Sequence, residues 1–176
     1  SFSGRLAIGN DTIRAAGFQD IFVASFQPDG TPRWAYRAGS DATNNASTLS
    51  ESGEDLAIGR SGNVYVTGHF YGTANFSTET VEAASDFSDV FIAALNPNSG
   101  GLIDVVRAGG LGEEAAYGIA LDQFDNAYIT GYFDGEPMEI PGLPNLTPFD
   151  ARVAYVLKLE TATFDYLWAD ETANPG

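Results

Sequence analysis

The chain contains no cysteine, one histidine and one lysine among its 176 residues. The absence of cysteine excludes disulfides, thiolate zinc sites and cysteine nucleophiles. The single histidine, His69, excludes multi-histidine metal sites and leaves Ser/His/Asp catalysis only if His69 itself is the base. No apolar run approaches the roughly 18 residues of a membrane-spanning helix, and the amino terminus shows no basic-then-apolar signal. We therefore expect no membrane insertion.

Basic residues are also scarce. Eight Lys and Arg face 24 Asp and Glu, which gives a formal charge of -16 that repels nucleic-acid phosphates and anionic lipid. We therefore expect no nucleic-acid partner, and an acidic, lysine-poor surface is typical of secreted or high-salt proteins. With 44% hydrophobic residues, 20 Gly and 8 Pro, the composition predicts an ordered all-β protein with short strands and tight turns.

What is abundant is repetition. RSGNVYVTGHFYG (60–72) returns as QFDNAYITGYFDG (123–135), and Ser1-Phe2-Ser3-Gly4 matches the end of that phrase. Three apolar segments, DIFVASF (20–26), DVFIAAL (89–95) and VAYVLKL (153–159), each predict a strand buried on both faces.

A second strand is predicted after each of these segments, in WAYRAG (34–39), DVVRAG (104–109) and DYLWAD (165–170). In this alignment the Arg-Ala-Gly of the first two copies becomes Trp168-Ala169-Asp170 in the third. Another hairpin precedes each complete pair, because apolar runs turn at Gly62-Asn63 and at Asp125-Asn126. Each full unit is therefore predicted to have four strands.

An insert separates the second and third strands of each unit. Residues 5–17 and 73–85 each predict a small hairpin, whereas the proline-rich 136–149 predicts no regular ladder. Four antiparallel strands repeating every 60–70 residues or so are typical of β-propeller blades.

The predicted domain organisation is a single propeller segment of about two and a half blades. Its parts are the second half of a blade (1–40), a full blade (54–109), a second full blade (116–170) and a tail or linker (171–176). A closed ring needs at least about four blades. The expected partners are therefore the remaining blades of the same polypeptide or other copies of the chain.

The ordered series D-I-F-V-A, W-A-Y-R-A-G, G-I-A-L-D, N-A-Y-I-T-G and F-x-G covers nearly the whole chain and resembles the bacterial seven-bladed beta-propeller repeat family. The resemblance implies an extracellular or cell-surface propeller within a large bacterial protein, and no particular activity. The expected function is a non-enzymatic structural or adhesive segment. The alternative is a module that binds a glycan or a surface protein.

Several oxygen-rich residues are candidates for chemistry. Asp122, Asp125 and Asn126 surround one turn, as Asp86 and Asp89 surround another, and calcium prefers such ligands. Side-chain bonds that stabilise the turns are the alternative explanation. A glycoside hydrolase would need two facing carboxylates, for which candidates lie at Glu113-Glu114 and among Glu51, Glu54 and Asp55. The alternative interpretation is that these acidic residues lie in solvated loops and have no catalytic role.

The remaining candidates are recurrent or aromatic. Arg37 and Arg107 occupy equivalent positions, which predicts a structural ion pair or a bond to a carbonyl group. Trp34 and Trp168 are predicted to pack between blades, with presentation to a ligand as the alternative. His69 aligns with Tyr132 and is expected on a strand surface.

Overall fold

The computed structural model of the protein describes residues 1–9, 11–40 and 51–172. These residues form strands, turns and no helix, which confirms the all-β prediction. The strands are β1 (Arg5–Ile8), β2 (Asp11–Arg14), β3 (Ile21–Phe26), β4 (Pro32–Ser40), β5 (Ser52–Ile58), β6 (Val64–Tyr71), β7 (Thr73–Phe76), β8 (Glu79–Glu82), β9 (Ser88–Leu95), β10 (Leu102–Ala108), β11 (Glu114–Leu121), β12 (Ala127–Asp134), β13 (Arg152–Glu160) and β14 (Asp165–Glu171).

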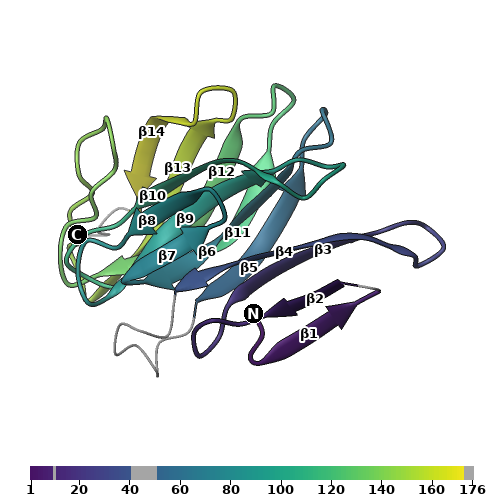
Figure 1. Ribbon diagram of the computed structural model, residues 1–176. Helices are drawn as coiled ribbons and strands as arrows, with labels where there is room; N and C mark the ends of the chain where they lie inside the picture. The colour runs from purple at the N-terminus through teal and green to yellow at the C-terminus, as the bar shows by residue number, and fades with distance from the viewer. Residues whose placement is uncertain (10, 41–50, 173–176) are drawn as a thin grey trace.

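Three sheets have four antiparallel strands each. We call β3-β4-β7-β8 the first sheet, β5-β6-β9-β10 the middle sheet and β11-β12-β13-β14 the last sheet. β1 and β2 form a separate hairpin that lies against β4 (Figure 1). The middle and last sheets have the four strands in the predicted order, and no described sheet closes on itself.

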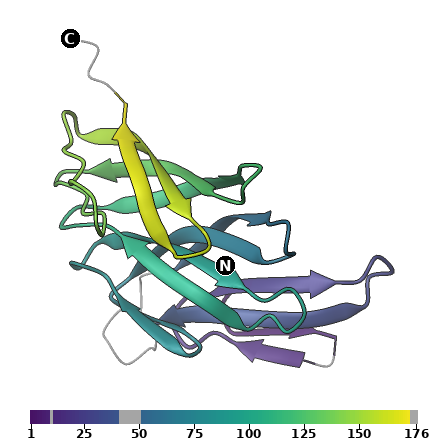
Figure 2. The same ribbon diagram turned by 90° about the horizontal axis from the view of Figure 1, so that it is seen from above.

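The three sheets pack face to face, with the middle sheet between the other two (Figure 2). One apolar core joins the first and middle sheets and includes Ile21, Tyr36 and Phe91. A second core joins the middle and last sheets and includes Ile92 and Leu157. Burial of such cores supplies the main stabilisation of a stack of sheets, because one sheet alone leaves both faces in water.

The register of pairing makes positions in the three sheets equivalent. The same rung joins the second and third strands of each unit, and its three instances are Phe2–Asp20, Phe70–Asp89 and Phe133–Val153. Counting from this rung shows which residues share a face, because alternate side chains of a strand point to opposite faces.

The Thr-Gly of the repeated phrase has a steric cause. A Cβ atom on Gly68 would overlap the carbonyl oxygen of Ser52, and one on Gly131 would overlap that of Ala115. Both glycines lie on the second strand of a sheet, opposite a register shift in the first strand. Only glycine permits this close approach of two backbones.

The inserts reach from one sheet to another. The predicted small hairpins form, as β1–β2 and β7–β8, and β7 pairs with β4 through Gly39–Asn75 and Ser40–Ala74. The insert of the middle unit therefore extends the first sheet, which the sequence did not reveal.

The proline-rich insert of the last unit has only an isolated bridge, Met138–Leu146, in agreement with its prediction. This insert also contacts the neighbouring middle sheet, without forming a strand pair. The N–H of Gly109, just after β10, donates to the carbonyl oxygen of Glu139 at 3.0 Å.

Two sequence predictions about the strands were wrong in detail. Only β9 is buried on both faces; β3 and β13 alternate in burial because each belongs to a sheet with a free outer face. The alignment of Trp168 with Arg107 was also wrong. Arg107 pairs with Phe91 and Glu171 with Tyr155, so Glu171 occupies the arginine position.

Candidate functional site

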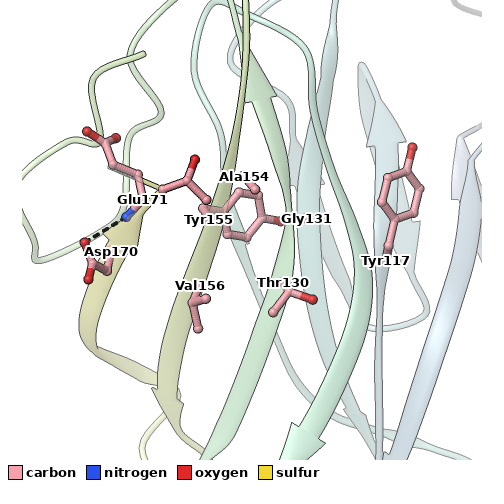
Figure 3. Close-up of a pocket in the computed structure, with 9 residues that line it drawn as sticks. Tyr117, Thr130, Gly131, Ala154, Tyr155, Val156, Asp170 and Glu171 are labelled. Carbon is pink, nitrogen blue, oxygen red and sulfur yellow. Dashed lines mark hydrogen bonds between the residues drawn. The ribbon is translucent and has the colours of Figure 1, made fainter. Parts of the chain in front are cut away.

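A hollow of about 460 Å³ lies on the outer face of the last sheet. All four strands contribute to it, through Tyr117, Thr130, Ala154, Val156 and Asp170. Thr130 and Val156 are direct cross-strand partners and lie side by side in Figure 3. We call this surface the last-sheet outer face.

Aromatic rings and cations extend the last-sheet outer face. The Arg152 guanidinium lies 3.8 Å from the ring centre of Tyr132, and Lys158 Nζ lies 4.8 Å from that of Tyr128. Trp168 stands edge-on to Tyr128 and is 41% exposed. Exposed aromatic rings with charged neighbours suit contact with a sugar or with another protein surface.

The equivalent face of the middle sheet is covered by the last sheet and allows a comparison. Thr130, Ala154 and Val156 are exposed or half-buried, and their register equivalents are Thr67, Val90 and Ile92. Those three equivalents are completely buried, on the face of the middle sheet that the last sheet covers. At these three positions the last-sheet outer face therefore keeps residues of the kinds that pack against another sheet, whereas Lys158 and Arg152 of the same face stand where the middle sheet has Ala94 and Ser88.

The two tryptophans occupy equivalent positions in different surroundings. Trp34 pairs with Ser25 as Trp168 pairs with Lys158. Trp34 is 6% exposed, and its Nε1 donates to the carbonyl oxygen of Pro97 in the next sheet at 2.9 Å. Packing between sheets is thus confirmed for Trp34, whereas Trp168 has no described sheet beyond it.

The candidate hydrolase acids are not brought together. Glu113 Oε1 accepts a hydrogen bond of 2.7 Å from the Tyr132 hydroxyl, whereas Glu114 points into the interior and accepts from the Gly110 N–H at 3.0 Å. Burial raises the pKa of Glu114 to about 8, with the charges of Asp89 and Asp134 adding to the effect.

The second acidic group is also dispersed. Glu51, the equivalent of Glu114, is buried and accepts a hydrogen bond from the Ser40 hydroxyl, and burial raises its pKa. Asp55 accepts from the Ile119 N–H at 3.0 Å, and Glu54 lies 3.9 Å from His69. The solvated-loop interpretation is wrong for Glu51 and Glu114, which lie inside the stack.

His69 is not on an open strand surface. Its side chain is only 17% exposed, and burial lowers its pKa. Nδ1 has no hydrogen-bond partner and lies 3.9 Å from Glu54, beside the Tyr71 ring. Among the described residues, no hydroxyl is hydrogen-bonded to Nδ1 of His69.

The calcium candidates Asp122 and Asp125 accept hydrogen bonds from backbone N–H groups. Asp122 accepts hydrogen bonds from the side-chain amide of Asn126 and from the backbone N–H groups of Phe124 and Asn126. These bonds, the one from the Asn126 side chain above all, lower the pKa of Asp122 to about 2. Asp125 instead accepts from the Arg60 N–H of the middle sheet at 2.9 Å. Within residues 1–9, 11–40 and 51–172 no three acidic or histidine side chains group as a metal site.

The acidic pair at residues 86 and 89 is likewise divided. Asp86 is exposed, whereas Asp89 is completely buried and pairs with Arg107. Asp20 and Arg37 form the same pair in the first sheet. Arg107 also reaches the carbonyl oxygen of Gly109 at 3.3 Å, so the predicted structural role of both arginines is confirmed.

Sequence reasoning missed the outer faces as candidate sites. A partial signal was present in the alignment, because the charged Lys158 stands where the middle unit has the buried Ala94. Apolar strands alone could not show which face of each sheet would be covered.

No family model matches this chain, and no curated protein matches it. Over the part of the chain that the structure describes, no helix is long and apolar enough to span a membrane.

Proposed function

We propose that the chain is a non-enzymatic structural segment whose four-stranded sheets are β-propeller blades. Its free faces and edges receive further blades, either of the same polypeptide or of other copies. The resemblance of its repeated phrases to a bacterial propeller family supports a secreted or cell-surface setting, where such a scaffold would display its inserts for adhesion.

The burial difference between equivalent residues carries this proposal. Val90 and Ile92 of the middle sheet are completely buried, whereas the equivalent Ala154 and Val156 of the last sheet are not. A terminal repeat that keeps a packing face is suited to contact with a further repeat unit, because one unit cannot bury both its faces alone.

The first sheet has the complementary face. Phe22 and Phe26 are 38% and 51% exposed on it, whereas the equivalent Phe91 and Leu95 are buried against the first sheet. Inside the chain, this kind of face always packs on the other kind. The two outer faces should therefore meet head to tail, as a heterologous contact and not a two-fold one.

The test is sedimentation velocity of the chain at rising concentration, with one charge placed on either face. Val156→Glu and Phe22→Glu should each weaken association at least about tenfold, which corresponds to about 1.4 kcal/mol. An equimolar mixture of the two variants should form dimers and nothing larger, because only one intact pair of faces remains.

Phe124→Glu is the matched control, since Phe124 is 76% exposed in the β11–β12 turn. This variant should associate like the parent chain. A parent chain that stays monomeric at millimolar concentration, or face variants that behave like Phe124→Glu, would refute stacking between copies of the chain.

Glycan binding is the second candidate, supported by the Tyr117 ring that lines the hollow, by the Tyr132 ring whose centre lies 5.7 Å from that of Tyr117, and by the exposed Trp168 elsewhere on the same face. Stacking of sugar rings on aromatic side chains would then be lost in Tyr117→Ala. Binding of the isolated chain on a glycan array, competed by free sugar and abolished by Tyr117→Ala, would establish this role. Self-association blocked by Val156→Glu without array binding would exclude it.

A further inference from the structure

β3 has a backbone edge that is paired in the other two sheets. There the equivalent strands, β9 and β13, pair along their length with β6 and β12. On β3 the same edge is met at one end by Phe2, which exchanges two backbone hydrogen bonds of 2.8 Å with Asp20. Among the described residues, no strand pairs with the rest of this edge.

The free hydrogen-bonding groups of this edge can be named. Antiparallel strands alternate between hydrogen-bonded and non-bonded rungs, and Asp20 belongs to a bonded one. Phe22, Ala24 and Phe26 therefore direct their N–H and C=O groups to the open edge, while Val23 and Ser25 direct theirs to β4. An unpaired row of this kind is a template for strand addition.

The space beside β3 is bounded by apolar side chains that lack cover. A hollow of about 370 Å³ lies between β3 and β5 and is lined by Phe22, Phe26 and Leu56. Leu56 is 48% exposed, whereas its equivalent in the last sheet, Ile119, is 7% exposed. The difference has a clear cause, because Ile119 packs against the complete middle sheet.

We infer that the slot between β3 and β5 is an acceptor site for an antiparallel β-hairpin with the repeat's own strand pattern. The second strand of that hairpin pairs with β3 in the register that Phe2 sets, and the hairpin covers Leu56. This inference rests on the proposed scaffold role and names the element that completes the first sheet.

The middle sheet supplies the precedent for this occupant. Its β5–β6 hairpin pairs with β9 and places Tyr65 and Ala57 against the last sheet. A hairpin of the same pattern on β3 would place the equivalent side chains over Leu56 on the neighbouring strand β5. Two strands are needed, because one strand would pair with β3 and leave the rest of the β5 face open.

The experiment adds the occupant covalently to the full chain. A second copy of residues 51–68 is placed directly before Ser1, so that its final glycine precedes Ser1 as Gly68 precedes His69. Amide hydrogen exchange of the extended protein, resolved by NMR, is compared with that of the original chain. Exchange at Phe22, Ala24 and Phe26 should slow at least tenfold, and the melting temperature should rise.

The matched control carries Val66→Pro in the added copy alone. Its proline removes the N–H that faces the third strand, since Val66 pairs with Ala93 in the middle sheet and the added residue would meet Ala24. This variant should exchange at Phe22, Ala24 and Phe26 as fast as the original chain. Val23 and Ser25 serve as internal references, because their bonds to β4 are present in all three proteins.

Two results would overturn the inference. One is equal exchange at the three edge amides in the extended and original proteins. The other is a concentration-dependent dimer of the original chain that already protects these amides, which would make a second copy's β3 the occupant. The three proteins are compared under conditions where sedimentation shows a monomer, and the original chain is also measured at higher concentration, so failure of face stacking and failure of edge pairing are distinguished.

Discussion

At the scale of single residues, Glu114 is a carboxyl group kept inside the stack. It is completely buried, and its Oε1 has no hydrogen-bond partner. Its pKa of about 8 means that the folded state holds a proton that the unfolded chain releases near pH 4.5. The contribution of this group to stability is complete below about pH 4.5 and is lost as the pH rises through 8.

The expected result is a protein more stable at pH 5 than at pH 8, and a Glu114→Gln variant that loses less stability over this interval. Each pKa unit corresponds to about 1.4 kcal/mol, so the difference should exceed about 1 kcal/mol. Glu114→Gln keeps an oxygen for the Gly110 N–H, and Glu113→Gln is the control. Urea unfolding at both pH values measures the change in the free energy of unfolding. Parallel pH profiles for the parent and both variants would contradict the assigned role of Glu114.

Two residues show how far the sequence could predict the site. The structural role of Arg107 followed from its recurrence with Arg37, because a repeated residue in one chain indicates a repeated contact. The exposure of Trp168 could not follow, since Trp34 at the equivalent position is buried. The difference is that the middle sheet covers Trp34, whereas no described sheet covers Trp168. A local pattern of residues does not encode this difference.

At the scale of elements, the two insert hairpins differ in support. β7–β8 joins the first sheet through β4, and Ala74 and Phe76 lie in the core. β1–β2 pairs with no other described strand, and an isolated two-stranded hairpin is marginally stable in water.

Amides of β1–β2 should therefore exchange at least about tenfold faster than those of β7–β8 in native-state hydrogen exchange. Phe76→Ala removes a ring that is 1% exposed and should bring β7–β8 close to the β1–β2 rate. Thr78→Ala, in the turn of the same hairpin, is the control and should leave it slow. Equal protection of both hairpins in the parent chain would contradict this expectation.

The strands themselves followed from the sequence, whereas their partners across sheets did not. Alternation and turn residues predicted all four strands of the middle and last sheets and both insert hairpins. The pairing of β7 with β4 joins strands that are separated in the chain by β5 and β6, and it accompanies the packing of Phe76 against Phe91 of the middle sheet. Such non-local contacts leave no short-range signal.

At the scale of the whole molecule, charge is the dominant feature. A formal charge of -16 on 176 residues causes self-repulsion that opposes the compact state. The Debye length falls from about 30 Å at 0.01 M salt to about 10 Å at 0.1 M, so salt should relieve this repulsion.

The melting temperature should rise between 10 mM and 500 mM sodium chloride. Sodium chloride is chosen because sulfate also strengthens apolar burial. Potassium chloride at the same ionic strength should give the same rise, since the effect depends on screening. A melting temperature that falls or stays constant over this range would show that self-repulsion does not limit stability.

The insert that joins two sheets also has a mechanical consequence. Because β7 leaves the middle sheet and pairs with β4, the first and middle sheets are connected by backbone hydrogen bonds as well as by side-chain packing. A force that pulls these two sheets apart must break the Gly39–Asn75 and Ser40–Ala74 rungs, whereas the last sheet's insert offers the single bond from Gly109 to Glu139. Tension along the stack therefore passes from sheet to sheet through the backbone, with a different number of bonds at each junction.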